Sequence, residues 1–314
     1  MTAVTRRTFA ATLVAAALTT AVAVPATAAT PSGAAARSAG HPTASGDYEN
    51  ARLKYQKFVA VDVIKGLFER GDTEVVDRYV SADLIQHNPT LPNGTGAFKK
   101  LGVSFHQQYP SLKVDIRQVI AEGDLVLLRS HITLSPEDRG NAFFDIYRFQ
   151  GGKIVEHWDV NQAVPATSVN GNDMFSTISQ PPTQQLGPRW LTVANKKLVT
   201  AYFDQLLVRK DVSAIDRYVS PDYHQHNPTV ADGAAATKAA IGGYFKLYPQ
   251  LTVEPKRIIA QGDLVAIHSH YTNAPGERGQ AVVDLFRVQN GKIVEHWDSL
   301  QDVPATSAND NTMF

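Results

Sequence analysis

The chain has 314 residues, of which 43% are hydrophobic and 19% are charged, a balance that supports a packed core and argues against global disorder. Its 30 Lys and Arg residues equal its 30 Asp and Glu residues, so the basic excess of nucleic-acid-binding proteins is missing and we expect no nucleic-acid partner. The sequence has no Cys, which excludes disulfides, thiolate metal sites and a cysteine nucleophile.

The first 29 residues have the pattern of an export signal. Arg6 and Arg7 precede an uncharged apolar run over 9–24, and an A-x-A cleavage motif follows before Ala29. A membrane anchor is the alternative, but the run is short and rich in Ala and Thr. The Arg pair resembles a twin-arginine signal, with general secretion as the other route. We therefore predict a protein secreted across the bacterial cytoplasmic membrane, with no membrane contact after cleavage.

The rest of the sequence is a tandem duplication of one unit. The motifs QHNPT, EHWD and VPATS each recur 139 residues later, and 52 of 100 positions are identical when 76–175 is laid on 215–314. Each copy is long enough for a domain of its own. The predicted order is a flexible lead-in over 30–50, a first domain over 51–175, a Pro- and Gln-rich linker over 176–189 and a second domain over 190–314.

Within each copy the helices precede the strands. In the first copy the apolar spacing predicts a helix over 53–70, a short second helix capped by Asp72 and a third helix over 97–109. Four strands are predicted over 113–121, 125–134, 141–150 and 154–160. This order predicts an α+β domain with its helices on one face of an antiparallel sheet. Because the strands are apolar on both faces, we expect the second copy to cover the other face, giving an internal pseudo-dimer.

Two polar residues inside the apolar strands are candidates for chemistry. Asp145 lies in AFFDIYRF and His131 in LVLLRSHITL, and their counterparts are Asp284 and His270. Burial raises the pKa of a carboxyl group, which suits a general base near neutral pH. A structural salt bridge with a neighbouring Arg is the alternative. Counting outward from the hairpin between the two strands predicts that His131 lies opposite Asp145.

Other His and Trp residues are candidates for the lining of a pocket. In QHNPT, His87 and its counterpart His226 lie either at a pocket rim or in a turn cap. Strand alternation in EHWD puts Glu156 and Trp158 on one face and His157 and Asp159 on the other, and Trp158 is interpreted as core or cavity wall. The substrate-binding set is then His87, Trp158, His226, His268 and Trp297.

Metal binding is conceivable only in the second copy. There His224 and His268 create two HxH pairs with His226 and His270, but the first copy lacks both added histidines. No nucleotide-binding fingerprint and no GxSxG motif appears. We therefore expect no metal and no cofactor. Since the second copy also has Tyr223 where the first has an apolar residue, its pocket is expected to be the more polar and the more active.

The order of elements, the QHNP turn, the strand His and Asp fourteen positions apart and the closing GKIVEHWD resemble the SnoaL-like polyketide cyclase family of the nuclear transport factor 2-like superfamily. This resemblance implies a cone-shaped domain in which a curved sheet wraps around helices and encloses a pocket. It implies that a strand Asp removes a proton next to a carbonyl, that a His assists, and that an aldol addition closes a ring without metal or cofactor. Asp145 with His131, and Asp284 with His270, match those catalytic residues.

Three functions are compatible with these residues. The first is an exported, cofactor-free acid–base enzyme that acts on a small carbonyl compound by aldol-type cyclisation or isomerisation. The second is an exported module that binds a small hydrophobic molecule without catalysis. The third is an epoxide hydrolase in which the same Asp activates water.

Overall fold

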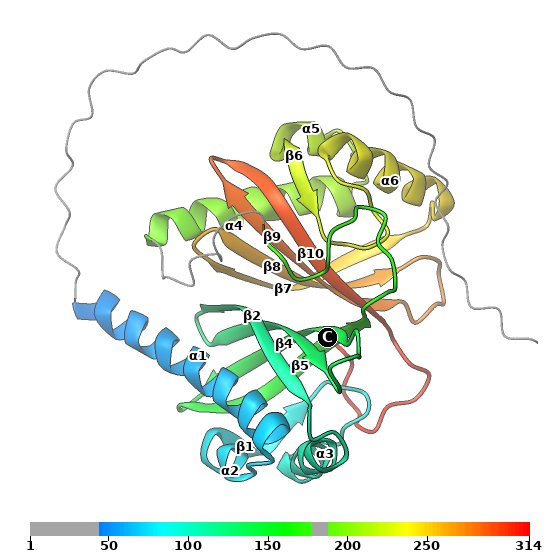
Figure 1. Ribbon diagram of the computed structural model, residues 1–314. Coiled ribbons are helices and arrows are strands. Elements are labelled where there is room, and N and C mark those ends of the chain that lie inside the picture. The colour runs from blue at the N-terminus through cyan, green and yellow to red at the C-terminus, as the bar shows by residue number, and fades with distance from the viewer. Residues whose placement is uncertain (1–43, 178–187) are drawn as a thin grey trace, which may run out of the picture.

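The computed structural model describes residues 44–177 and 188–314 and contains two copies of one α+β domain (Figure 1). Domain 1 contains α1 (Ala44–Arg70), α2 (Glu74–Tyr79), β1 (Val80–Gln86), α3 (Thr95–Gln108), β2 (Lys113–Glu122), β3 (Leu125–Thr133), β4 (Asn141–Gln150) and β5 (Lys153–Ala163). Domain 2 contains α4 (Arg189–Phe203), the π-helical turn η1 (Asp204–Val208), α5 (Ala214–Tyr218), β6 (Val219–Gln225), α6 (Ala234–Leu247), β7 (Thr252–Gln261), β8 (Leu264–Thr272), β9 (Gln280–Gln289) and β10 (Lys292–Asp302). The predicted α+β class and tandem organisation are confirmed.

Parts of the predicted organisation lie outside the described residues. These are the export signal over 1–29, the lead-in up to position 43 and positions 178–187 of the linker. The helix α1 begins at Ala44, so the last part of the predicted lead-in is helical. An established helix extends at little cost through residues such as Glu49 and Ala51, which explains the earlier start.

Each sheet has five strands, one more than predicted. The order is β1-β5-β4-β3-β2 in domain 1 and β6-β10-β9-β8-β7 in domain 2. The four predicted strands pair antiparallel, whereas β1 and β6 pair parallel to the last strand of their domain. The sequence of β1 is hard to recognise as a strand because its polar Ser81 and Asp83 interrupt the apolar pattern, and only Val80 and Leu84 are buried apolar residues.

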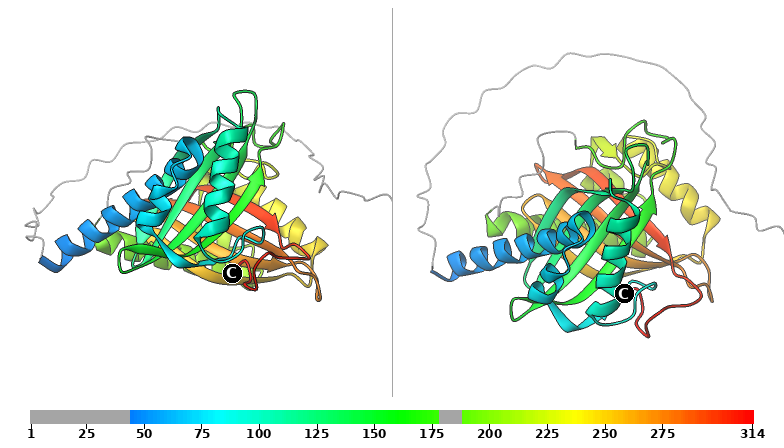
Figure 2. Two further views of the ribbon diagram at one scale, coloured as in Figure 1. Left: turned by 90° about the horizontal axis from the view of Figure 1, so that it is seen from below. Right: turned by 60° about the horizontal axis from the view of Figure 1, so that its bottom comes forward.

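Helices cover one face of each sheet. Figure 2 shows α1 and α3 side by side across the outer face of the first sheet. The two helices approach closely because α3 has Gly102 at the crossing, where a Cβ atom would overlap the side chain of Leu67. The core beneath them contains buried apolar side chains, among them Val59, Val63, Leu67, Val114, Val126 and Leu128.

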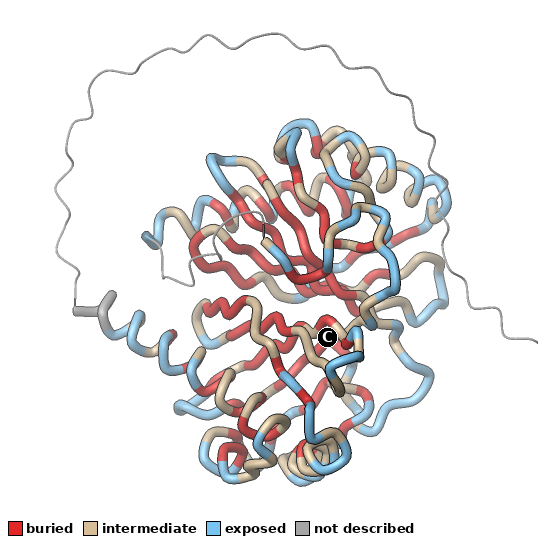
Figure 3. Tube along the Cα trace, in the orientation of Figure 1, coloured by how far each residue is buried: buried red, intermediate tan, exposed pale blue. Residues whose placement is uncertain are grey.

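The opposite faces of the two sheets pack against each other. The buried strands of both domains meet in the middle of the molecule (Figure 3). This interface is a single apolar cluster that includes Ile120, Leu127, Phe144, Ile146, Trp158, Ile259, Leu264, Val283, Leu285 and Trp297. Paired hydrogen bonds follow the internal symmetry, since Ala121 N donates to Gln261 Oε1 at 2.9 Å and Ala260 N donates to Glu122 Oε2 at 2.8 Å. Among the described residues, no helix has the length and apolar character needed to cross a bilayer.

Candidate functional site

The QHNPT and EHWD motifs of each domain lie beside each other, because QHNPT begins at the end of the first strand, which pairs with the last strand that contains EHWD. In domain 1, β1 pairs with β5 so that Gln86 lies beside His157. Gln86 and Asn88 point into the helix-covered interior, where they contact His157 and Asp159. His87 points the other way, towards domain 2. The alternation of side chains in each motif therefore separates an inner cluster from an outer one.

The inner cluster of domain 1 consists of Asp145, His157 and Asp159, all buried and with one ligand atom from each within 4.8 Å of the others. His157 Nε2 lies 3.2 Å from Asp145 Oδ1, and His157 Nδ1 lies 2.9 Å from Gln86 Oε1. Asn88 Nδ2 donates to Asp159 Oδ2 at 2.6 Å. The predicted general base therefore has a histidine partner on β5, the strand on the other side of β4 from His131.

Domain 2 repeats this inner cluster with Asp284, His296 and Asp298. His296 Nε2 lies 2.9 Å from Asp284 Oδ1, and its Nδ1 lies 2.9 Å from Gln225 Oε1. Asn227 Nδ2 donates to Asp298 Oδ2 at 2.7 Å. Because the same contacts are built twice, they follow from the repeated motifs.

The hydrogen bonds of the QHN motif fix which ring nitrogen of the inner histidine carries a proton. The backbone N–H of Asn88 donates to Gln86 Oε1 at 2.9 Å, which identifies that atom as the amide oxygen. His157 Nδ1 faces the same oxygen, so Nδ1 must be the donor. The other nitrogen, Nε2, then faces the Asp145 carboxylate and needs a proton between them. The His157–Asp145 pair thus holds a proton in a buried site.

The electrostatics of the inner clusters agree with this arrangement. Burial raises the pKa of Asp159 to about 6, against the opposing effect of His157, and burial likewise raises the pKa of Asp298 to about 6. Burial by itself would lower the pKa of His157, but the hydrogen bond to Asp145 and the charges of Asp159 and Asp145 outweigh it and raise that pKa. The pKa of His296 is raised in the same way. Asp159 and Asp298 therefore exchange protons close to pH 6, and the two histidines hold their protons more tightly than a free imidazole does.

We expect the folded protein to lose stability as pH rises from about 4 through the neutral range. The raised pKa values of Asp159 and Asp298 mean that the folded state holds protons that the unfolded chain releases, and the raised pKa values of His157 and His296 act in the same direction. The lowered pKa of His268 acts in the opposite direction, but it is one group against four. This stabilisation is complete below the unfolded pKa values and disappears as pH passes the folded ones. The midpoint of thermal unfolding should fall by on the order of 5 °C over that range. An Asp159→Asn/Asp298→Asn variant should show a shallower slope; an unchanged slope would contradict these proton affinities.

The two inner clusters differ in what surrounds them. In domain 2 the Tyr271 hydroxyl donates to Asp284 Oδ2 at 3.2 Å, so both oxygens of that carboxylate have partners. Domain 1 has Ile132 at the position of Tyr271, and Asp145 Oδ2 is buried without a hydrogen-bond partner. The Tyr147 hydroxyl is also buried and unpartnered. The base in domain 1 therefore keeps an oxygen that can accept a further proton.

With this geometry in place, the comparisons with known proteins decide the family. The model of the SnoaL-like domain matches residues 61–157 and again 199–296, together more than half of the chain. The chain belongs to the SnoaL-like domain family. Both matches include the Asp and the His of an inner cluster.

Several solved structures are similar to one SnoaL-like domain of this chain. AclR, a putative hydroxylase from Streptomyces galilaeus, is 26% identical, with 36% of this chain and 91% of AclR covered and a TM-score of 0.31. A putative SnoaL-like polyketide cyclase from Jannaschia sp. CCS1 is 17% identical, with 37% and 92% covered and a TM-score of 0.33. TsrD from Streptomyces laurentii is 20% identical, with 35% and 89% covered and a TM-score of 0.30. The comparison with curated proteins returned no match.

The predicted contact between His131 and Asp145 is wrong. In the sheet His131 pairs with Ala142, whereas Asp145 pairs with Leu128. His131 Nε2 bonds to the Arg139 carbonyl at 2.7 Å, and its ring stacks on Phe175 at 4.0 Å. Counting from the hairpin failed because the turn is centred closer to β3 than assumed, so that Ile132 pairs with Asn141. The partner of His131 is therefore three positions from Asp145, and an odd shift moves a side chain to the other face.

His270 repeats this placement in domain 2. It pairs with Ala281, bonds to the Arg278 carbonyl at 2.8 Å and lies against Phe314 at 4.4 Å. The strand histidines of this SnoaL-like protein therefore hold the hairpin and the tail of their own domain. The inner histidines His157 and His296 were missed as catalytic candidates, although strand alternation in EHWD already set each on one face with an Asp.

The predicted substrate-binding residues lie between the domains, in an outer cluster. His87 stacks on Trp158 with ring centroids 4.8 Å apart, and its Nε2 bonds to Glu156 Oε1 at 2.9 Å. His226 and Trp297 repeat this stack at 5.1 Å. His87 and Trp158 are thus separated by the sheet from the inner cluster that contains Asp145. They contribute to the domain interface, and their role in substrate binding stays a prediction.

His268 has no histidine counterpart in domain 1, because the Arg that contacts the Trp of the other domain occupies different strands in the two domains. It is at position 129 on β3 in domain 1 and at position 257 on β7 in domain 2. In domain 1 the buried Arg129 donates to Gln118 and lies 4.8 Å from the ring of Trp297 in domain 2. In domain 2 the corresponding positions are His268 and Arg257, and Arg257 lies 3.6 Å from the ring of Trp158. Each domain thus places one guanidinium over the Trp of the other. Burial and the positive charge of Arg257 lower the pKa of His268 to about 3, so it stays neutral.

Among the described residues, the only groups with metal-binding geometry are the two inner clusters, not the HxH pairs. A cation between the carboxylates would have to displace the proton on the inner histidine. We therefore predict that elemental analysis of the purified protein finds no stoichiometric metal. Stoichiometric zinc or manganese that is lost in a His157→Ala/His296→Ala variant would contradict this.

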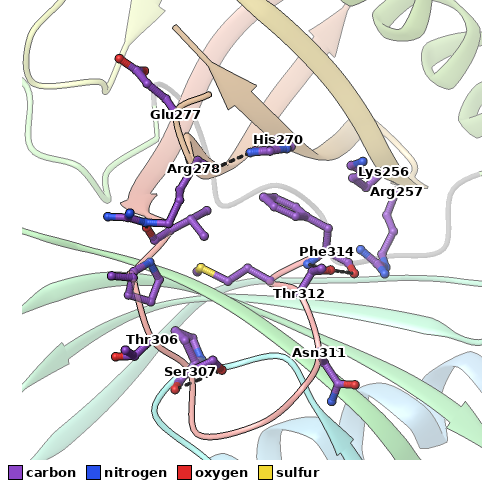
Figure 4. Close-up of a pocket in the computed structure, with 15 residues that line it drawn as sticks. Lys256, Arg257, His270, Glu277, Arg278, Thr306, Ser307, Asn311, Thr312 and Phe314 are labelled. Carbon is purple, nitrogen blue, oxygen red and sulfur yellow. Dashed lines mark hydrogen bonds between the residues drawn. The ribbon is translucent and has the colours of Figure 1, made fainter. Parts of the chain in front are cut away.

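A separate hollow of about 680 Å³ lies where the tail of domain 2 meets domain 1 (Figure 4). Its lining includes four basic residues and one acidic residue, Lys256, Arg257, His270, Arg278 and Glu277, and the apolar residues Val303, Met313 and Phe314. The predicted catalytic residue His270 therefore faces this hollow and not Asp284. Its basic and apolar lining suits a small molecule with a negative charge.

Proposed function

We propose that this SnoaL-like protein is an exported, cofactor-free acid–base enzyme that acts on a small carbonyl compound by aldol-type cyclisation or isomerisation. One observation carries the proposal. In each domain a glutamine fixes the inner histidine as a donor at Nδ1, so that a proton must lie between Nε2 and a buried carboxylate. Enolisation needs a group that accepts a proton from carbon and later returns it, and a buried carboxylate paired with a protonated histidine is such a group.

In the proposed reaction Asp145 Oδ2 removes a proton from the carbon next to a carbonyl. The electron pair of that C–H bond forms an enolate, whose oxygen the Tyr147 hydroxyl is available to stabilise by donating a hydrogen bond. The enolate carbon then attacks a second carbonyl of the same molecule. The new alkoxide takes the proton back from Asp145, so the enzyme returns to its starting state. Return of the proton to a different carbon gives isomerisation instead.

Domain 1 is favoured as the more active site. Its Asp145 Oδ2 and Tyr147 hydroxyl are buried and without partners, whereas Asp284 Oδ2 in domain 2 already accepts from Tyr271. From the sequence, the second copy was expected to be the more active because its pocket has more polar residues. Two of those residues, His224 and His268, are not part of its inner cluster. Tyr271→Phe should free Asp284 and raise the contribution of domain 2.

The experiment has two steps. Native mass spectrometry first identifies small molecules that the protein retains from its producing cells. Those molecules, and a panel of β-diketones, are then incubated with the protein in D₂O. Incorporation of deuterium next to the carbonyl, faster than in buffer, is the expected result. No incorporation into any retained carbonyl compound would contradict the proposal.

A binding protein without catalysis is the second candidate, and the hollow beside His270 favours it. That hollow presents Arg278 and Lys256, the latter paired with Glu254 at 2.8 Å, to an anion, and Met313 and Phe314 to an apolar group. A pure binding protein should retain an anionic ligand, lose it in an Arg278→Ala variant, and promote no deuterium exchange. Asp145→Asn should then leave retention unchanged.

A further inference from the structure

Each QHN turn is held by the tail of the opposite domain. The tail of domain 2, residues 303–314, crosses to domain 1, where Asn311 Nδ2 donates to the Gln86 carbonyl at 3.0 Å and to Asn93 Oδ1 at 2.8 Å. From the same tail, Asn309 Nδ2 donates to the carbonyls of Asn88 at 2.9 Å and Leu91 at 2.8 Å. Two asparagines of domain 2 thus bind the backbone of the residues that contact the inner cluster of domain 1.

The tail of domain 1 makes the equivalent hydrogen bonds to the QHN turn of domain 2. In the tail of domain 1, residues 164–177, Asn172 Nδ2 donates to the Gln225 carbonyl and to Asp232 Oδ1, both at 2.9 Å. Asn170 Nδ2 donates to the carbonyls of Asn227 at 2.7 Å and Val230 at 2.8 Å. Asn170 and Asn172 lie 139 positions before Asn309 and Asn311, so the exchange is symmetric.

The turn that is held in this way sets the proton position in the cluster. Gln86 Oε1 accepts from His157 Nδ1, and Asn88 donates to Asp159. Asn93 Oδ1 accepts from the Gln86 backbone N–H at 2.9 Å while it accepts from Asn311, so one tail residue fixes Gln86 on both sides. The chain of contacts runs from the tail to the turn and from the turn to His157.

We propose that the tail asparagines are positioning residues in trans: Asn309 and Asn311 for the inner cluster of domain 1, and Asn170 and Asn172 for that of domain 2. Each proton-holding cluster is then complete only with the other domain in place. This inference rests on the proposed function for its catalytic meaning, but its test needs no substrate.

The test measures the imidazole pKa values of His157 and His296 by NMR in the full chain, with signals assigned through His157→Gln and His296→Gln. In Asn309→Ala/Asn311→Ala, the pKa of His157 should fall towards that of a free imidazole by about half to one pH unit, because Gln86 of the turn holds the ring against Asp145, whose hydrogen bond and charge raise that pKa. The pKa of His296 should not move. The mirror variant Asn170→Ala/Asn172→Ala should shift His296 and spare His157.

Asp310→Ala is the matched control, since Asp310 is exposed in the same tail and between the two asparagines. It should shift neither histidine. If a double variant fails to fold, the single Asn311→Ala and Asn172→Ala variants give the same crossed comparison with fewer lost contacts. Equal shifts of both histidines, or no shift in a folded variant, would overturn the proposal. A crossed shift together with absent deuterium exchange would support the positioning role and refute the enzyme.

Discussion

Asp145→Asn is expected to slow deuterium exchange into the carbonyl substrate by about 10²–10⁴-fold if domain 1 is the working site. The amide keeps the shape of the side chain but removes the acceptor that takes the proton. The structure favours domain 1 because Asp145 Oδ2 has no hydrogen-bond partner, whereas Asp284 Oδ2 has one. Asp284→Asn alone should therefore have a smaller effect, and the double variant should be almost inactive. Steady-state rates of the four proteins decide between one and two working sites.

The control for that series is Asp310→Asn, which makes the same chemical change on an exposed tail residue. It should retain the wild-type rate. If the double variant exchanged deuterium as fast as the wild type, neither inner carboxylate would be the base, and the binding function would become the better explanation.

A single domain produced alone is expected to self-associate. Residues 44–177 without domain 2 would expose the apolar face that contains Ile120, Phe144 and Trp158, a patch of the kind that drives association. The free tail of one copy could then bind the QHN turn of another, as the two tails do within the chain. Light scattering after size exclusion should show a dimer or larger species. A monodisperse, folded monomer would contradict the view that each domain needs the other.

The repeated sequence made the architecture predictable. Helix periodicity over 53–70 and alternation around Asp145 are local signals, and the structure has the corresponding α1 and β4. The apolar character of both strand faces indicated a second layer, and the faces with Phe144 and its counterpart Val283 do meet between the domains. Such features depend on residues close together in the chain, so one sequence is enough to find them.

The residues that surround Asp145 were harder to predict, because they depend on how the strands are aligned with one another and on the additional strand β1. Asp145 was identified from its setting, but the pairing of β4 with β5 was needed to bring His157 beside it. The contact with Gln86 depends on the parallel strand β1, which a short and polar-interrupted sequence does not reveal. His87 and Trp158 were predicted to line a pocket, and the structure shows that their rings stack at the domain interface.

In the proposed mechanism each domain stores a transferable proton between a buried histidine and a buried carboxylate. The most direct measurement is the ¹⁵N NMR spectrum of the full chain at pH 7, which distinguishes protonated from unprotonated imidazole nitrogens. We predict that both ring nitrogens of His157 and of His296 carry a proton, or that Nε2 shares one with its Asp. A neutral ring with an unprotonated Nε2 facing Asp145 or Asp284 would contradict proton storage in these clusters.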